Sequence, residues 1–310
     1  MAELSAKKKR ELEAAAHEAI NNLTYVRDFV EWGASQFTVN NVYFGHGTDN
    51  PHDEALVLVF SVLGLEFDIA RDVLDTPLCR QQKIAILELI VRRIVERKPV
   101  SYLTGEAWFA GCKFRVDERV LIPRSPIAEW IERGFSPWID AQCVRRILDL
   151  GTGSGCMAIT AALAFPQSEV IAVDNSQEAL QVARLNIESY GLGHRVVALS
   201  SDMFSDITGR FDVILSNPPY VDDLELASMP DEFHHEPLIG LSGGKDGLDF
   251  VRTILTQAPA YMNENAILIV EVGASAPALL KAYPRLPFVW LDLERGGENV
   301  FLLEHRDFQC

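Results

Sequence analysis

Ile147-Leu-Asp-Leu-Gly-Thr-Gly-Ser-Gly155 joins a short apolar run to a glycine-rich loop, and an alanine-rich segment follows it. A short apolar run bounded by glycine predicts a buried strand, and the alanine-rich segment predicts a helix. The same rhythm continues downstream, so we expect an α/β domain with a parallel sheet covered by helices on both faces. The predicted strands are 147–150, 170–173, 196–199, 211–215, 266–270, 289–291 and an antiparallel seventh at 298–303, and the predicted helices are 127–135, 156–165, 177–190 and 274–283.

The first third of the chain has the pattern of a separate helical domain. Apolar residues recur at helical spacing from Leu12 to Val26, and further helices are predicted at 53–65 and 78–95, with a glycine-rich turn at 44–51. The aromatic run 108–116 and the apolar run 120–123 then have strand character and are expected to pair. The prediction is a helical domain at 1–105, a β-hairpin linker at 106–122 and an α/β domain at 123–310.

Composition and charge are those of an ordinary globular protein. The chain has 310 residues, of which 48% are hydrophobic, and a formal net charge of −16. No apolar stretch approaches the ~20 residues that span a bilayer, and no secretory signal is evident, so we expect a cytoplasmic protein without membrane contact. The five cysteines form no CxxC pair and the histidines lack metal-ligand spacing, which favours no metal site. The negative charge disfavours a nucleic-acid partner.

The predicted sheet places three polar elements beyond the carboxyl ends of neighbouring strands, where ligands bind in such folds. Asp149 and the loop Gly151-Thr152-Gly153-Ser154-Gly155 follow the first strand, Asp174 ends the second, and Asp202-Met203 follows the third. Asp174 can accept both hydroxyls of a ribose, and Asp202-Met203 can flank an adenine. The glycines fall as G-x-G-x-G after a carboxylate. This pattern suits a cationic nucleoside such as S-adenosylmethionine better than the pyrophosphate of NAD, although both interpretations remain open on these residues alone.

Asn217-Pro218-Pro219-Tyr220 follows the fourth predicted strand. The two prolines fix φ and remove two N–H donors, so the tetrapeptide is predicted to be a rigid ledge with free acceptors. The side-chain oxygen of Asn217 and the carbonyl of Pro218 can accept the two hydrogens of a planar –NH2 group, while Tyr220 packs against its plane. Such a ledge can position a weakly nucleophilic nitrogen for methyl transfer, which makes Asn217, Pro218 and Tyr220 the candidate catalytic residues.

These residues together resemble the class I S-adenosylmethionine-dependent methyltransferases that act on exocyclic or amide nitrogen. The chain is similar end to end to the N(5)-glutamine methyltransferase family, and Val120-Leu-Ile-Pro-Arg124 and 241–248 fit that family as well. The resemblance implies a Rossmann-like seven-stranded catalytic domain with a helical N-terminal domain and a hairpin linker. The cofactor contacts that it implies are 151–155, Asp174, Asp202, Met203 and Asn217, and the target glutamine would be held by Asn217, Pro218, Pro219 and Tyr220.

Two branches of that family differ after Ile-Pro-Arg. The branch that acts on peptide release factors continues with Pro-Asp-Thr-Glu, whereas this chain has Ser-Pro-Ile-Ala-Glu at 125–129. Together with 44–49 and 53–55, this segment resembles the branch that methylates a glutamine of the large-subunit ribosomal protein uL3, which is therefore the implied partner, free or in an assembly intermediate. The alternatives are glutamine methylation of release factors, N6-adenine methylation of nucleic acid, and a non-catalytic scaffold.

Overall fold

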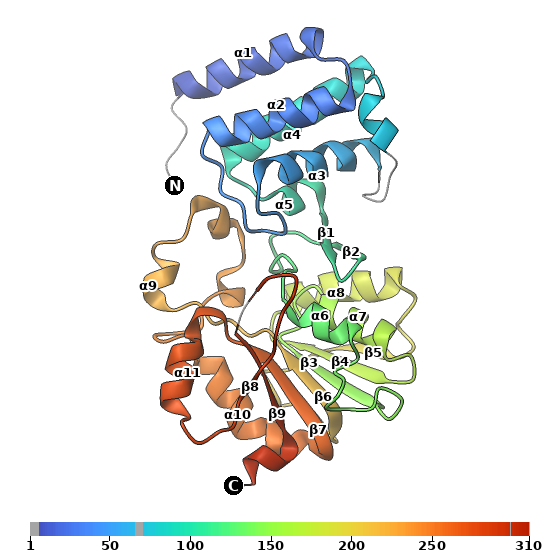
Figure 1. Ribbon diagram of the computed structural model, residues 1–310, viewed down its shortest axis with the longest axis vertical. Coiled ribbons are helices and arrows are strands. Elements are labelled where there is room, and N and C mark those ends of the chain that lie inside the picture. The colour runs from blue at the N-terminus through green and yellow to red at the C-terminus, as the bar shows by residue number, and fades with distance from the viewer. Residues whose placement is uncertain (1–5, 66–70, 298, 310) are drawn as a thin grey trace. The chain divides into compact units, whose positions relative to one another are not determined.

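The computed structural model describes residues 6–65, 71–297 and 299–309. The chain divides into two compact units (Figure 1). The helical unit extends to Glu106 and also includes Pro230–His235, and the α/β unit consists of Ala107–Met229 and the chain from Glu236 onward. The division differs from the predicted one in two places, because residues 107–122 group with the α/β unit and a short downstream segment returns to the helical unit. Within the described residues, no helix has both the length and the apolarity needed to cross a bilayer.

The helical unit surrounds one apolar core, which includes Phe29, Phe37, Leu58 and Ile90. Its elements are α1 (Ala6–Asn22), α2 (Val26–Val39), α3 (Pro51–Leu63), the 3-10 turn η1 (Arg71–Asp75), α4 (Arg80–Glu96) and α5 (Val100–Thr104).

The prediction of one continuous helix from Leu12 to Val26 is wrong, because α1 ends at Asn22 and Val26 opens α2. The reason is local, since the side chain of Asp28 accepts hydrogen bonds from the backbone N–H groups of Thr24 and Tyr25, at 2.9 and 2.8 Å, and so starts a new helix.

The α/β unit contains a seven-stranded sheet in the order β5-β4-β3-β6-β7-β9-β8. The first five strands in this order are parallel, while β9 is antiparallel to β7 and to β8. Their bounds are β3 (Arg146–Leu150), β4 (Glu169–Asp174), β5 (Val196–Ser200), β6 (Phe211–Ser216), β7 (Met262–Glu271), β8 (Val289–Trp290) and β9 (Val300–Glu304). The seven predicted strands are thus confirmed in place and direction, except that Glu298 lies outside the described residues.

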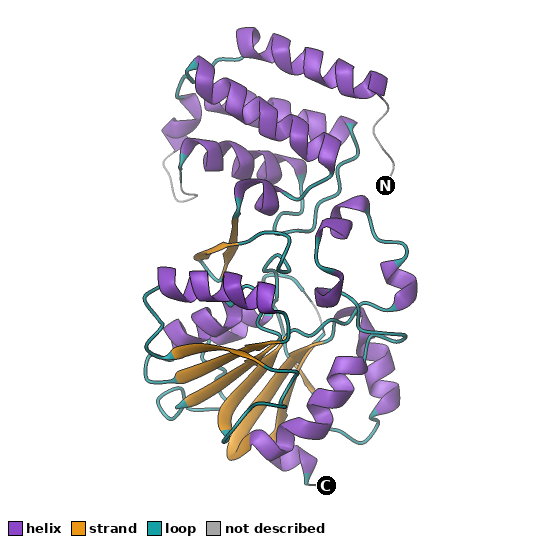
Figure 2. Ribbon diagram, turned by 180° about the vertical axis from the view of Figure 1, so that it is seen from behind, coloured by secondary structure: helices purple, strands orange, loops and turns teal. Residues whose placement is uncertain are grey.

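Helices cover both faces of this sheet (Figure 2). One core lies against α6 (Ile127–Glu132), α7 (Cys156–Ala164) and α8 (Gln177–Ser189), and the other against α10 (Asp249–Tyr261) and α11 (Ala276–Ala282). Short elements lie in the long connections: α9 (Asp223–Leu226), η2 (Asp231–His235), η3 (Leu238–Gly240), η4 (Gly273–Ser275) and η5 (His305–Phe308). The apolar residues alternate between the two cores along a strand, as in β6, where Val213 and Leu215 belong to the first core and Ile214 to the second.

The strand order reverses between β3 and β6. From β3 the chain builds outward through β4 and β5, and it then returns to add β6 on the other side of β3. In that pair Leu150 is opposite Ser216, so the loops that begin at Gly151 and Asn217 leave the sheet side by side. A crevice at such a reversal is where open α/β sheets bind ligands.

The predicted hairpin is present but shorter than expected. β1 (Glu106–Phe109) and β2 (Cys112–Arg115) pair across a turn at Ala110 and Gly111, whose φ values are +48° and +71°. The expectation that 120–123 joins this pairing is wrong. The N–H of Ile122 donates instead to the buried carboxylate of Glu236 at 3.0 Å.

Candidate active site

The loop after β3 turns tightly at its three glycines. The glycines at 151, 153 and 155 have φ values of +72°, +54° and +81°, which side chains with a Cβ rarely adopt. The N–H of Thr152 donates to the carbonyl of Val173 at 2.8 Å, which ties the loop to β4. Because α7 begins directly afterwards at Cys156, the N–H groups of its first turn, which have no partner within the helix, adjoin the loop.

Asp174 ends β4 beside this loop. Its carboxylate accepts hydrogen bonds from the N–H groups of Gly153 and Ser176, both at 2.9 Å. Burial raises the pKa of Asp174, and those N–H groups oppose the rise by favouring the charged form. The side chain is therefore held in one orientation at the end of the strand, as a ribose acceptor needs to be.

Asp149 lies beneath the loop and is fully buried. One of its oxygens, Oδ2, accepts a hydrogen bond from the Thr152 hydroxyl at 2.6 Å and one from the N–H of Ala158 at 3.1 Å. Within the part of the chain that the structure describes, the other oxygen, Oδ1, has no partner. Burial raises the pKa of Asp149 to about 7. The carboxylate thus supports the loop from below, and its predicted contact with the cofactor stays a prediction.

Asp149→Asn should change how the stability of the ligand-free protein depends on pH. The folded-state pKa of about 7 lies above the reference value of 3.8, so the folded chain binds this proton more tightly than the unfolded chain does. The contribution of Asp149 to the free energy of unfolding therefore falls as the pH rises through the window from 3.8 to about 7, by at most about 1.4 kcal/mol per pH unit. Urea denaturation across the window should show the variant gaining stability relative to the wild type as pH rises, and a constant difference would contradict this account.

The predicted ledge follows β6 and is anchored at both ends. At its start, the hydroxyl of Ser216 donates to the carbonyl of Leu150 at 2.9 Å. At its end, the hydroxyl of Tyr220 donates to Glu271 at 2.9 Å, and the carbonyl of Tyr220 accepts from the hydroxyl of Ser275 at 2.8 Å. The side-chain amide of Asn217, in contrast, makes no hydrogen bond to any described residue, so it is available to a ligand.

Gly247→Ala should displace the ledge. A Cβ at this position would overlap the Ser275 hydroxyl and the Tyr220 carbonyl, and its φ of +72° is unfavourable for alanine as well. Gly191→Ala is the matched control, since its φ is +67° and nothing lies within 4 Å of its Cβ. We expect the control to lose about 1 kcal/mol of stability, and Gly247→Ala to lose about 1–3 kcal/mol more together with most of its activity. Equal losses in thermal or chemical denaturation would show that the contact is unimportant.

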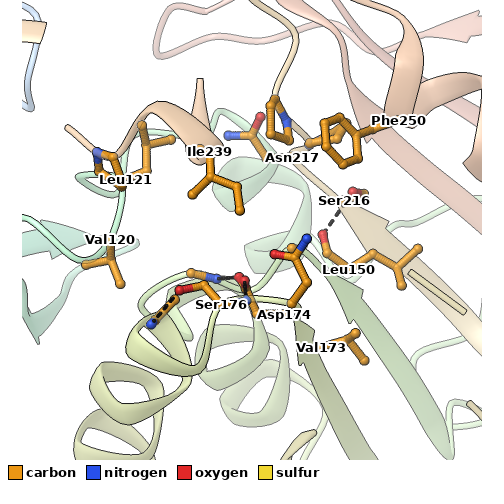
Figure 3. A pocket seen from close by; sticks show the side chains of 18 of the residues that line it. Val120, Leu121, Leu150, Val173, Asp174, Ser176, Ser216, Asn217, Ile239 and Phe250 are labelled. Carbon is orange, nitrogen blue, oxygen red and sulfur yellow. Dashed lines mark hydrogen bonds between the residues drawn. The ribbon is translucent and has the colours of Figure 1, made fainter. Parts of the chain in front are cut away.

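A pocket opens where the two loops leave the sheet (Figure 3). It measures about 760 Å³ when the open solvent at its mouth is included. Of the predicted site residues, those that line it are Gly151, Gly153, Asp174, Met203, Asn217, Pro218 and Pro219. Those outside the lining are Asp149, Thr152, Ser154, Gly155, Asp202 and Tyr220. Asp202 is exposed and lines a neighbouring hollow together with Met203 and Phe250.

Several apolar residues that line the pocket were not among the predicted site residues. In Figure 3, Val120, Leu121 and Ile239 face the pocket from one side, and Phe250 and Leu150 from the other. An ion pair between Arg124 and the buried Glu236 ties the segment of Val120 and Leu121 to that of Ile239. Arg124 donates to both carboxylate oxygens of Glu236, at 2.6 and 2.8 Å, which fixes the segments that carry these apolar residues. The sequence carries a signal for Val120 and Leu121, which belong to the family-like segment 120–124, whereas Ile239 and Phe250 lie outside 120–124 and 241–248.

The charge of the pocket restricts its ligand. Among the described residues that line it, Arg119 is the one cation and Asp174 the one carboxylate. The guanidinium of Arg119 is committed to Asp117, to which it donates at 2.8 and 2.6 Å. A pyrophosphate here would have to bind through backbone N–H groups alone, whereas a nucleoside without phosphates needs no cation. The described residues also contain no group of three His, Cys, Asp or Glu side chains that could hold a metal ion.

A family profile and a solved structure are similar to parts of this chain. A family profile described as "Methyltransferase small domain" matches residues 136–233. Among solved structures, the chain resembles the catalytic domain of hMettl16 bound to a MAT2A 3'UTR hairpin, with 16% identity and a TM-score of 0.49 over 72% of this chain and 80% of that one.

Two curated relatives are similar over nearly the whole chain. A ribosomal protein uL3 glutamine methyltransferase of Francisella tularensis is 46% identical over 290 residues, which are 93% of this chain and 92% of the relative. A protein of the same name from Neisseria gonorrhoeae is 44% identical over 288 residues, or 93% of this chain and 96% of the relative. The chain therefore belongs to the ribosomal protein uL3 glutamine methyltransferase family.

Proposed function

We propose that this enzyme transfers the methyl group of S-adenosylmethionine to the side-chain amide nitrogen (N5) of a glutamine in ribosomal protein uL3. The observation that carries the proposal is the position of Asn217. Its amide, without a partner among the described residues, lies in the same pocket as Gly151, Gly153 and Asp174. The names of the two curated relatives support uL3 as the substrate. Because that substrate is a ribosomal protein, we place the reaction in the cytoplasm.

The residues of the pocket fit S-adenosylmethionine. Asp174 suits the ribose hydroxyls, the glycine loop permits close approach of the backbone, and Val120, Ile239 and Phe250 offer apolar surface to an adenine. A pocket without a free cation favours a ligand that carries no phosphate. When bound, S-adenosylmethionine supplies an electrophilic methyl group on a sulfonium.

The proposed role of the ledge, residues 217–220, is to position the target amide. An amide nitrogen is a poor nucleophile because its lone pair is delocalised into the carbonyl. On this proposal, the Asn217 side-chain oxygen and the Pro218 carbonyl accept the two amide hydrogens, and Tyr220 fixes the plane of the group. The lone pair is thereby aimed at the methyl, and the two acceptors stabilise the positive charge that develops on nitrogen. Solvent can take the proton afterwards, so no ionised base is required.

The helical unit is proposed to recognise uL3. Every residue that lines the pocket belongs to the α/β unit, so the helical unit is not needed to form it. Substitutions on its exposed surface are expected to raise KM for uL3 without changing the Kd for S-adenosylmethionine.

The test of the proposal is a competition between substrates. The purified enzyme is given S-adenosylmethionine with a labelled methyl group and, separately, uL3, a peptide release factor and an adenine-containing oligonucleotide. We expect label in uL3 alone, and peptide mass spectrometry should place one added methyl on one glutamine side chain. A uL3 variant in which that glutamine is replaced by glutamate should accept none. Label in the release factor or the oligonucleotide instead would reject uL3 as the substrate.

Salt should separate capture of the protein substrate from binding of the cofactor. The chain carries a formal net charge of −16, which would attract a basic ribosomal protein from solution. Raising the ionic strength should therefore lower kcat/KM for uL3 while leaving the Kd for S-adenosylmethionine nearly constant. Equal sensitivity of both constants would contradict electrostatic capture.

A further inference from the structure

A buried carboxylate lies behind the ledge, and the proposed chemistry does not use it. Glu271 ends β7, directly after Val270, which is opposite Ser216 of β6. The side chain is buried, and each of its oxygens accepts one hydrogen bond. The hydroxyl of Tyr220 donates to Oε1 at 2.9 Å, and the hydroxyl of Ser125 donates to Oε2 at 2.6 Å. Glu271 therefore joins a catalytic candidate to the segment that precedes α6.

A carboxylate at this depth is costly unless it is compensated. Burial raises the pKa of Glu271, while the two hydroxyl donors and the charge of Arg124 lower it and so favour the ionised form. Arg124 is itself fixed by its two hydrogen bonds to Glu236. An ionised acceptor makes a stronger hydrogen bond to a hydroxyl than a neutral one does.

The same stretch of chain fixes the rest of Tyr220. A Cβ at Gly273 would overlap the aromatic ring, so the ring lies directly against this glycine. The hydroxyl of Ser275 donates to the Tyr220 carbonyl at 2.8 Å. The hydroxyl, ring and carbonyl of Tyr220 are thus held by three residues within 271–275. The prolines of the ledge fix the backbone of 218–219, but they do not fix this side chain.

We propose that Glu271, supported by Ser125, is a positioning residue for methyl transfer that acts by holding the plane of the Tyr220 ring. The inference rests on the proposed function, in which Tyr220 orients the target amide. Glu271 touches neither substrate nor cofactor on this account. Its loss should therefore lower kcat and leave the Kd for S-adenosylmethionine unchanged.

A double-mutant cycle tests the coupling. Tyr220→Phe removes the donor, and Glu271→Gln keeps the shape of the acceptor but removes its charge. Each single variant is expected to lower kcat about tenfold. The double variant should also lower it about tenfold rather than a hundredfold, because the two changes remove the same interaction. Glu129→Gln is the matched control. Glu129 is also buried, but it accepts hydrogen bonds from the N–H groups of 294 and 295. Any factor by which Glu129→Gln lowers kcat should therefore multiply with the factor for Tyr220→Phe.

A second readout does not depend on the substrate. With 13C-labelled tyrosine, the Cζ resonance of Tyr220 is identified by its loss in Tyr220→Phe. It should shift in Glu271→Gln and stay in place in Glu129→Gln. The positioning role is overturned if the resonance does not shift in Glu271→Gln. It is also overturned if the losses of kcat in Glu271→Gln and Tyr220→Phe multiply in the double variant. Absence of label in uL3 with the wild-type enzyme would instead reject the proposed function, and the resonance would still decide whether Glu271 holds Tyr220.

Discussion

Asn217→Ala is expected to lower kcat for methyl transfer by about 10²- to 10³-fold, the usual loss when one preorganised polar group is removed from a reaction centre. The side chain lines the pocket and makes no hydrogen bond to any described residue, so its removal costs the described structure no hydrogen bond. Because Gly151, Gly153 and Asp174 remain, the Kd for S-adenosylmethionine should rise by no more than about tenfold. Single-turnover rates with saturating cofactor, combined with calorimetric titration, separate the two constants.

The control for Asn217→Ala is the same substitution at the opposite end of the sheet. Asn263 lies near the start of β7, where its amide donates to Asp212 at 2.6 Å. Asn263→Ala should cost some stability and leave kcat unchanged. If Asn217→Ala binds the cofactor and retains full activity on uL3, the ledge does not orient the amide, and the chemical mechanism proposed for it is wrong.

The elements that local patterns specify were predicted correctly. The apolar runs of the sheet, the glycine loop at 151–155 and Asp174 are each visible within a few residues of sequence. The reversal between β3 and β6 follows from the order of these runs together with the rule for where ligands bind in such sheets. It brings the loop and Asn217 into one pocket, and the roles of these residues in binding and catalysis stay predictions.

The parts that were missed depend on contacts between distant segments. Tyr220 was predicted from its motif, but its partner Glu271 lies 51 positions away. In the sequence, Glu271 only follows an apolar run, and nothing there links it to Tyr220. The helix α10 was not predicted, although Val251, Ile254, Leu255 and Ala258 have helical spacing and are buried. Its first turn carries Phe250, which lines the pocket. Local propensity identifies elements, and only packing shows which side chains meet.

The most unexpected of these distant contacts is a buried cluster of charges in the helical unit. Arg93 of α4 is completely buried, and its guanidinium donates to Glu54 at 2.6 Å and to the carbonyl of Tyr43 at 2.7 Å. Glu232, from the downstream segment 230–235, lies 3.5 Å from the same guanidinium and also accepts from the N–H of Tyr43 at 3.0 Å. This cluster, together with Phe233 against the ring of Tyr43, explains why the segment belongs to the helical unit.

Arg93→Met should therefore destabilise the helical unit by about 3–5 kcal/mol, because it leaves the buried carboxylate of Glu54 without its cation and leaves Glu232 paired with Arg97 alone, at 3.3 Å. The neighbouring Arg92 provides the control. It is about half exposed and pairs with Glu96 one turn away at 2.9 Å, so Arg92→Met should cost less than about 1 kcal/mol. Urea denaturation measures both losses, and limited proteolysis should show 230–235 becoming cleavable in Arg93→Met alone. If the two variants lose equal stability, the cluster does not hold this segment. If Arg93→Met combined with Glu54→Gln and Glu232→Gln recovers most of the loss, the cost comes from the uncompensated carboxylates rather than from the lost volume of the arginine.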